Sequence, residues 1–327
     1  MDRVRPIVWG LPDHYIQWLE ILSDMAEFSR QWRVRNLRKF SVFSSTQLIT
    51  FLPFSHCFFQ TGSRNRLTKV WSFTKNNGCN LGLPLQMELL FHEDIPMSTI
   101  VEQIEGCACK SQCCLTSTNQ CRCRLRSTNP YNAVGLLTNF SASLFECNSN
   151  CVCEMTCPNR LVQVKHPIYR ITEKSDVGKG LVANRDIACG EMICAYLGEV
   201  VPPEVGRLRE LAQRKRYGRT YVLTMREYAH ERLVAETCID GDVSLPNSGQ
   251  PDARLVNHSC DANVTVIPVR VDSIIPYAVL FANRFIPRDT ELTYDYADGV
   301  PTEYRLTSGT QCRCNSADCM GYLPCVE

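Results

Sequence analysis

Two short stretches near the C-terminus decide the fold: Arg254-Leu255-Val256-Asn257-His258-Ser259-Cys260 and Glu291-Leu292-Thr293-Tyr294-Asp295-Tyr296. Three cysteines follow them with the spacing Cys312-x-Cys314-x4-Cys319. The first stretch contains an Asn-His pair that can form several hydrogen bonds, the second contains two closely spaced phenols, and the cysteines have metal-ligand spacing. Each feature alone also fits an ordinary core. Their order along one chain is what makes them informative.

The overall composition is ordinary for a globular protein. A length of 327 residues is enough for about two domains. The net charge of +1 gives no general attraction to nucleic acid or to a membrane, so direct DNA binding is not implied. The longest run without a charged residue, residues 40–63, is too polar to span a bilayer, and we expect no membrane association.

Cysteine is the exceptional residue type, with twenty in the chain. The chain opens with Met1-Asp2-Arg3-Val4-Arg5 and no apolar stretch follows, so we expect no secretory signal. In a reducing compartment, Cys-x-Cys spacing favours a shared metal over disulfides, which remain the alternative. Ten cysteines fall into two groups between residues 107 and 157: Cys107, Cys109, Cys113, Cys114, Cys121 and Cys123, then Cys147, Cys151, Cys153 and Cys157.

These ten cysteines predict three zinc ions. Zinc takes four ligands, and nine thiolates satisfy three ions if three of the thiolates bridge. Either Cys113 or Cys114 is then surplus. The surrounding segment has little hydrophobic pattern, so metal binding would have to organise it.

The second half of the chain predicts a mostly β fold with minor α content, built from several small sheets. One helix is expected after Pro202-Pro203, with an apolar stripe of Val205, Leu208, Leu211 and Ala212. Another is expected from His14 to about Trp32. Strands are predicted at residues 192–201, 220–225, 233–239, 263–271 and 277–285.

In combination, these features resemble the SET-domain protein lysine methyltransferases of the suppressor-of-variegation class. Glu146-Cys147-Asn148 and Cys157-Pro158-Asn159-Arg160 look like the end of a pre-SET zinc module. Three stretches look most like the methyltransferase half of the SET proteins that are fused to a transposase: residues 222–227, 257–263 and 267–273. The resemblance implies a SET fold with a knotted-like active-site segment. It divides the chain into an extension of unknown role (1–90), a pre-SET module (91–164), a SET domain (165–298) and a post-SET module (308–325).

The resemblance also implies a fourth zinc beside the active site. Cys312, Cys314 and Cys319 are one ligand short of a closed zinc site, and Cys260 is the natural fourth. The remaining cysteines are expected to be ordinary thiols: Cys57, Cys79, Cys189, Cys194, Cys238 and Cys325.

S-adenosyl-L-methionine is the cofactor that the resemblance implies. The turn Val177-Gly178-Lys179-Gly180 would let the backbone approach it, although most relatives have Trp where Lys179 stands. The other expected cofactor contacts are Tyr221, Arg254, Asn257 and His258.

The catalytic residues implied by the resemblance are three tyrosines. Tyr296 would orient the lysine amine and the methyl group, and Tyr196 would line the same pocket. The hydroxyl of Tyr294 leaves less room for extra methyl groups, which favours mono- or dimethylation. The amine must be neutral to attack, so desolvation and a neighbouring sulfonium must lower its pKa from about 10.4.

The predicted function is transfer of methyl groups to a lysine of the histone H3 tail or nucleosome, in the nucleus on the chromosome. One departure from the family pattern leaves alternatives open. Residues 242–252 are longer than the usual Gly-Asn approach and end just before Arg254. A catalytically impaired SET protein that binds chromatin, or a methyltransferase for a non-histone protein, are the other readings.

Overall fold

The computed structural model describes residues 69–71, 89–101, 104–109, 121–127, 130–141, 143–163, 168–174, 178–229, 232–245, 252–297 and 306–325. Several predictions therefore lie outside the described residues. They are the helix at 14–32, the surplus ligand at Cys113 or Cys114, the cofactor contact at Val177, and the thiols Cys57 and Cys79.

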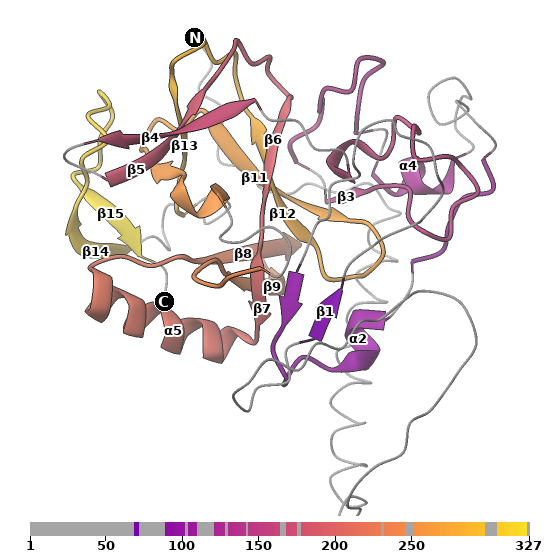
Figure 1. The fold of residues 1–327 in the computed structure, drawn as a ribbon, viewed down its shortest axis with the longest axis horizontal. Coiled ribbons are helices and arrows are strands. Elements are labelled where there is room, and N and C mark those ends of the chain that lie inside the picture. Colours follow the sequence, from indigo (N-terminus) through magenta and orange to yellow (C-terminus); the bar gives the residue numbers. More distant parts are fainter. Residues whose placement is uncertain are drawn as a thin grey trace, which may run out of the picture.

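Three sheets dominate the described residues (Figure 1), which confirms a mostly β fold with minor α content. The five-stranded sheet has the order β1 (Lys69–Trp71), β2 (Leu89–Phe91), β7 (Gly198–Val201), β9 (Arg232–Asp240) and β8 (Val222–Ala229). A two-stranded sheet joins β14 (Leu306–Gln311) and β15 (Tyr322–Cys325). The helices are α2 (Met97–Val101), α4 (Arg122–Arg126) and α5 (Pro203–Tyr217), with 3-10 turns η1 (Leu161–Gln163) and η2 (Asp252–Leu255).

The eight-stranded sheet carries the centre of the hydrophobic core. Its order is β4 (Tyr169–Lys174), β5 (Gly178–Ala183), β13 (Glu291–Tyr294), β11 (Val264–Arg270), β12 (Tyr277–Ala282) and β6 (Met192–Tyr196). Two short strands add to it, β10 (Asn257–His258) on β13 and β3 (Leu144–Phe145) on β11. Every residue of β12 is buried, so this strand is a continuous apolar run rather than an alternating one.

The strand predicted at residues 192–201 is two strands in different sheets. It breaks at Leu197, after which β7 joins the five-stranded sheet while β6 stays with β12. Apolar residues continue across the break because both strands are buried, so the sequence pattern hides the change of sheet.

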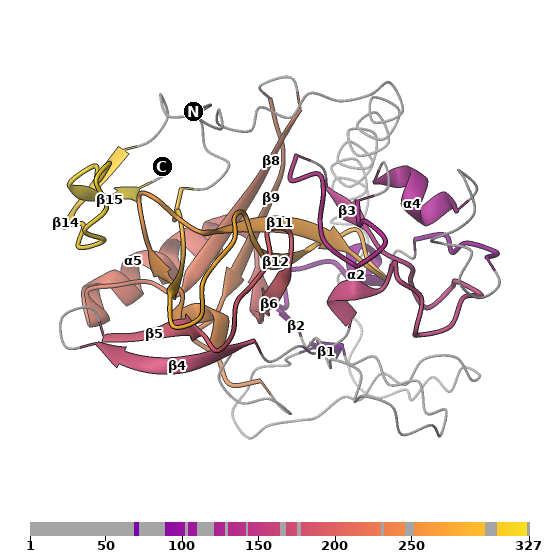
Figure 2. The same ribbon diagram turned by 90° about the horizontal axis from the view of Figure 1, so that it is seen from above.

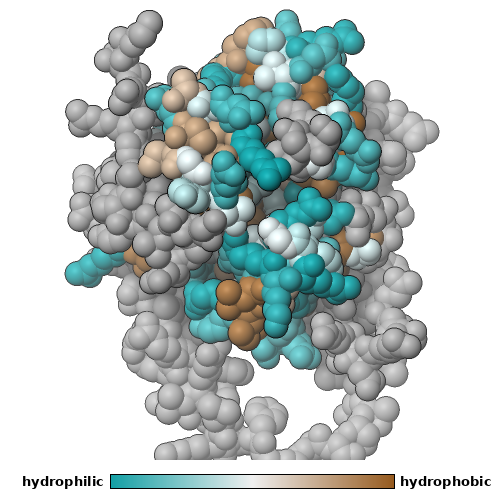
Figure 3. Space-filling model, turned by 90° about the vertical axis from the view of Figure 1, so that its left-hand side faces the viewer, coloured by the Kyte–Doolittle hydropathy of each residue, from teal (hydrophilic) through white to brown (hydrophobic). Residues whose placement is uncertain are grey.

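Helix α5 forms where it was predicted, but the predicted apolar stripe was wrong. Leu208 and Leu211 are 68% and 66% exposed, and the buried positions are Gly206 and Gln213. The physical reason is that the sheet presents acidic side chains to this helix. Arg209 on its inner face pairs with Glu199 and Asp240, so the polar side of the helix turns inward. Figure 3 views the flank of the molecule that carries α5, and separate apolar patches interrupt its hydrophilic surface.

The pairing of β10 with β13 positions the site. Strand β10 pairs in parallel with β13, with Asn257 opposite Thr293 and His258 opposite Tyr294, so the two signature stretches lie side by side. The β14–β15 hairpin lies at one end of the molecule. The segment that contains α4 and β3 lies at the other end (Figures 1 and 2). Within the described ranges, no helix has the length and apolar character needed to cross a membrane.

Candidate active site and cysteine clusters

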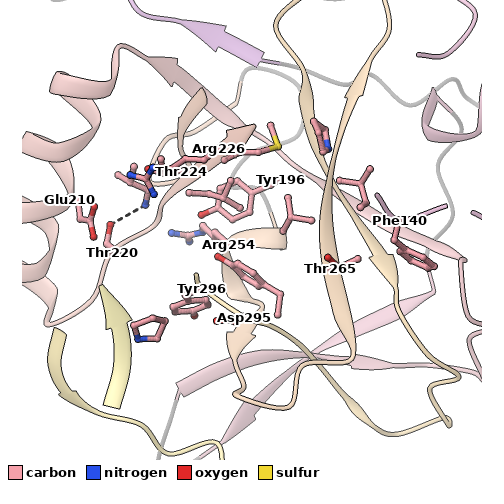
Figure 4. Close-up of a pocket in the computed structure, with 18 of the residues that line it drawn as sticks. Phe140, Tyr196, Glu210, Thr220, Thr224, Arg226, Arg254, Thr265, Asp295 and Tyr296 are labelled. Atoms are coloured by element: carbon pink, nitrogen blue, oxygen red, sulfur yellow. Dashed lines mark hydrogen bonds between the residues drawn. The ribbon is translucent and has the colours of Figure 1, made fainter. Parts of the chain in front are cut away.

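A cavity of about 110 Å³ brings together residues from both signature stretches (Figure 4). Tyr196, Arg254, Tyr294 and Tyr296 all line it. Its other walls are residues 222–226 of β8 and residues 265–268 of β11, with Phe140 and Pro324 also in the lining. Strands from both large sheets therefore meet at this cavity.

The three tyrosines differ in how they are held. Tyr196 is buried, and its hydroxyl donates to the carbonyl of Tyr221 at 2.7 Å. Tyr296 donates to the carbonyl of Val256 at 3.2 Å, and its ring centroid lies 4.8 Å from that of Tyr294. The hydroxyls of Tyr196 and Tyr296 are therefore each held by a backbone carbonyl.

Two of the three phenols at the cavity, those of Tyr196 and Tyr296, stay protonated at neutral pH. Burial raises the pKa of Tyr196 well above its usual value, and repulsion from Tyr296 and Asp240 adds to this. Burial, with the neighbouring Tyr221, also raises the pKa of Tyr296, although 39% of this residue remains exposed. Neutral phenols act by hydrogen bonding, so this site orients groups rather than removing protons from them.

His258 links the cavity to the C-terminal cysteines. Its Nδ1 accepts a hydrogen bond from the backbone N–H of Tyr296 at 3.2 Å. The neutral ring must then carry its proton on Nε2, which lies 3.4 Å from the Sγ of Cys260. One side chain therefore fixes the backbone of Tyr296 and donates toward a cysteine sulfur.

The glycine turn at β5 lies against Asn257. The Nδ2 of Asn257 donates to the carbonyl of Lys179 at 3.2 Å and to Glu291 at 2.9 Å. A Cβ at Gly180 would come within 2.7 Å of the Glu291 carboxylate, and Gly178 has a φ of +82°. The backbone therefore favours glycine at position 178, a side chain at position 180 would displace Glu291 or Asn257, and the turn lies directly against Asn257.

Arg254 occupies the cavity despite the atypical residues before it. Its guanidinium lies 4.9 Å from the ring centroid of Tyr221 and pairs with Asp242 at 3.6 Å. The longer stretch before Arg254 therefore leaves this side chain at the cavity. Residues 246–251 of that approach lie outside the described part of the chain.

The C-terminal cysteines converge as predicted. The Sγ atoms of Cys260, Cys312, Cys314 and Cys319 all lie within 4.8 Å of one another, and the Cys260–Cys312 pair is 3.9 Å apart. A tetrahedral zinc with Zn–S bonds of about 2.3 Å requires sulfur–sulfur separations of about 3.8 Å. The four side chains fit that requirement.

The pre-SET cysteines form two overlapping groups. One consists of Cys107, Cys147, Cys151 and Cys153, and the other of Cys107, Cys121, Cys123 and Cys147. The sulfurs of Cys107 and Cys157 each lie 3.8 Å from that of Cys147, which again fits a tetrahedral edge. A thiolate that bridges two metal ions must belong to both groups, as Cys107 and Cys147 do. Cys109 packs against the same cluster.

Polar groups around the pre-SET sulfurs also suit bound metal. The backbone N–H groups of Asn148 and Cys107 donate to the Sγ of Cys151, and Asn159 donates to Cys147. Arg160 lies 3.7 Å from the Sγ of Cys153. Such donors stabilise thiolates, and outer contacts of this kind orient metal ligands.

The expected ordinary thiols are consistent with that role. Cys238 is buried, Cys194 is partly buried and Cys189 is exposed, and none of them belongs to a potential metal group in the described residues. The side chain of Cys325 lies outside the description.

Sequence reasoning missed two buried polar groups near the cavity. Gln213 on α5 contacts the backbone of Tyr221, and Glu227 on β8 pairs with Arg270 on β11 at 2.6 Å. Neither belongs to a recognisable motif. The sequence signal for the Glu227–Arg270 ion pair is a charged residue within a strand that is otherwise buried.

Comparison with known proteins identifies the family to which this chain is similar. The sequence model of the SET domain matches residues 178–297, and that of the Pre-SET motif matches residues 71–160. The probable histone-lysine N-methyltransferase set-23 of Caenorhabditis briggsae is 34% identical, over 68% of this chain and 88% of its own. SETMAR of Bos taurus, a histone-lysine N-methyltransferase, is 35% identical over 67% of this chain and 74% of its own.

The solved structures include a similar fold. The methyltransferase domain of human SETMAR superposes with a TM-score of 0.55 at 27% sequence identity. The match covers 68% of this chain and 81% of that domain.

Proposed function

Because this chain belongs to the SET-domain family of histone-lysine methyltransferases that carry a pre-SET motif, we propose that it methylates a lysine of the histone H3 tail. S-adenosyl-L-methionine is the proposed methyl donor. The observation that carries the proposal is the single cavity at which Tyr196, Tyr294, Tyr296 and Arg254 meet.

The proposed donor site is the surface formed by the glycine turn and the Asn-His pair. Gly178, Lys179 and Gly180 would offer backbone groups at close approach, and Asn257 and His258 would add hydrogen bonds. Tyr221 and Arg254 would contribute a stacked aromatic–guanidinium wall. When bound there, the sulfonium supplies an electrophilic methyl group and a positive charge.

The proposed lysine site is the cavity itself. Neutral phenols at Tyr196 and Tyr296 would accept and orient the amine, and apolar neighbours would exclude water from it. Desolvation disfavours the protonated amine, so the cavity promotes the neutral form that attacks. Holding amine and methyl group in line then provides much of the rate.

Within the described residues, one edge of the five-stranded sheet lies beside the cavity and suits an extended peptide. Strand β8 is the last strand of the five-stranded sheet, and its residues 222–226 line the cavity. An unpaired edge can accept a further strand through backbone hydrogen bonds. A flexible histone tail lying along β8 would place its lysine toward the tyrosines.

The proposed product is mono- or dimethyllysine, because the ring of Tyr294 lies 4.8 Å from that of Tyr296 and its hydroxyl would take up space that added methyl groups need. The proposed metal content is three zinc ions at the pre-SET cysteines and one at Cys260, Cys312, Cys314 and Cys319. The proposed place of action is the nucleosome, in the nucleus.

Mass spectrometry of recombinant H3 and nucleosomes incubated with S-adenosyl-L-methionine tests the proposal. We expect methyl groups on one H3 tail lysine, at mildly alkaline pH and with zinc retained. A Tyr296→Phe variant, which keeps the ring but loses the hydroxyl, should be at least ~100-fold slower. Absence of methyl transfer to any histone would refute the proposal. Cofactor binding without turnover would then favour an impaired chromatin-binding protein, and transfer only to other proteins would favour a non-histone substrate.

A further inference from the structure

One buried side chain on α5 reaches the backbone of the proposed site from outside the cavity. Gln213 is 8% exposed and lies on the inner face of the helix. Its Oε1 accepts hydrogen bonds from the backbone N–H of Tyr221 at 2.7 Å and from the hydroxyl of Thr220 at 3.2 Å. Its Nε2 donates to the Oδ1 of Asp240 at 2.9 Å.

These partners allow only one orientation of the amide. The Asp240 carboxylate can only accept, and the N–H of Tyr221 can only donate. A residue at this position must therefore donate on one side and accept on the other. Glutamine does both, whereas an ionised carboxylate or an apolar side chain does not.

Tyr221, the residue whose backbone N–H Gln213 holds, is a junction of the site. The carbonyl of Tyr221 accepts hydrogen bonds from the Tyr196 hydroxyl at 2.7 Å and from the backbone N–H of Gly241 at 2.9 Å. The ring of Tyr221 lies beneath the guanidinium of Arg254. A shift of this backbone would move a proposed lysine-site phenol and a proposed donor-site wall together.

Helix attachment does not depend on Gln213. Arg209, one turn earlier, forms ion pairs with Glu199 at 2.6 Å and Asp240 at 2.8 Å. Gly206 packs so closely on Cys238 that a Cβ would come within 2.9 Å of it. The contact that Gln213 alone provides is the one to Tyr221.

We propose that Gln213 is a positioning residue for methyl transfer, which sets the Tyr221 backbone and, through it, Tyr196 and Arg254. This inference rests on the proposed function. It predicts that changes at Gln213 alter both the use of the methyl donor and the rate of transfer, because one residue, Tyr221, contacts both halves of the site.

Two variants at this position separate positioning from general stability. Gln213→Leu keeps the volume but loses all three side-chain hydrogen bonds, so kcat should fall ~10-fold and the KM for S-adenosyl-L-methionine should rise several-fold at every pH. Gln213→Glu should depend on pH. The ionised carboxylate faces Asp240 without a donor, whereas the protonated form restores one. The ratio of variant to wild-type rate should therefore rise as the pH falls.

Steady-state kinetics across pH, calorimetric titration with S-adenosylhomocysteine and thermal melting provide the test. Ala212→Glu, at the exposed neighbouring position on the same helix, is the matched control and should keep wild-type kinetics. A flat rate ratio for Gln213→Glu together with an unchanged KM for Gln213→Leu would overturn the inference. A wild-type protein without activity would instead refute the proposed function, and S-adenosylhomocysteine affinity would then decide the role of Gln213 by itself.

Discussion

The two cysteine clusters share one chemistry but differ in their relation to the cavity. The pre-SET cluster is buried, with Cys147 fully inaccessible, and none of its described cysteines lines the cavity. In the C-terminal cluster, Cys260, Cys314 and Cys319 are partly exposed. Cys260 contacts His258, and Pro324 of the same segment lines the cavity.

This difference indicates two uses of bound metal. In the buried cluster, two metal groups share cysteines, and bound metal would take the place of a hydrophobic core. Metal there would therefore contribute mainly to folding. In the partly exposed cluster, Cys260 lies two residues after His258, so metal there would hold a wall of the site in place. Mutations in the two clusters should therefore separate stability from activity.

The largest expected effect is on folding, from Cys147→Ser. Cys147 belongs to both pre-SET metal groups, so its loss should prevent the whole module from forming. Circular dichroism and zinc analysis should report loss of cooperative unfolding and of more than one zinc ion. Cys189→Ser, at an exposed cysteine outside the clusters, should behave as wild type. A folded Cys147→Ser protein with full zinc content would remove the distinction between the clusters.

A smaller effect on stability is expected where the pre-SET side contacts the SET sheets. Glu227 on β8 pairs with Arg270 and accepts a hydrogen bond from the Ser143 hydroxyl at 2.5 Å. Replacing one partner of a buried pair leaves the other charge unpaired, so Glu227→Gln should lower the free energy of unfolding by about 3–5 kcal/mol. Urea denaturation measures this. Glu204→Gln, at an exposed position on α5, should change little.

The same pair predicts the direction of a pH effect. Burial alone would raise the pKa of Glu227, but Arg270 and the hydrogen bonds outweigh it and lower that pKa. The stabilisation is therefore fully present above the carboxyl's unfolded pKa and is lost as the pH falls through the lower folded pKa. Wild-type stability should fall toward acid pH more steeply than that of Glu227→Gln. Parallel profiles would contradict this assignment.

Cys260→Ser should affect activity more than stability. Loss of this ligand frees His258 and with it the backbone of Tyr296, so methyl transfer should fall ~100-fold while the melting temperature changes by only a few degrees. Zinc content should fall by one ion. Unchanged transfer with that zinc absent would show that the C-terminal cluster does not shape the site.

The smallest effect is expected within the cavity, from Tyr294→Phe. Removing this hydroxyl makes room beside Tyr296, so the product should move to a higher methylation state with the total rate changed only a few-fold. Mass spectra of the product at matched turnover measure this. An unchanged product distribution would mean that Tyr294 does not limit the space for methyl groups.

Local spacing is why so much of the site could be read from the chain. The convergence of Cys260 with Cys312, Cys314 and Cys319 follows from ligand number, and the structure brings these four together. The proximity of Asn257 to the second signature stretch was also predicted, and strand pairing provides it. Their roles toward donor and lysine remain proposals.

Long-range pairing is why the rest could not be read. The apolar spacing of Leu208 and Leu211 predicted a buried face, but acidic residues on β7 and β9 select the opposite face of the helix. Gln213 accepts a hydrogen bond from the backbone of Tyr221, and no sequence pattern predicts this contact.

By itself, the sequence determined the family features: which cysteines are spaced to share metal, which glycines the turn needs, and which tyrosines accompany the Asn-His pair. These are properties of neighbouring residues and of ligand counts. Only the tertiary structure decided how two sheets meet at the cavity, which side of α5 faces them, and which buried polar groups hold the tyrosines. Those properties depend on contacts between residues far apart in the chain, where a polar group is buried only if a partner from another element satisfies it.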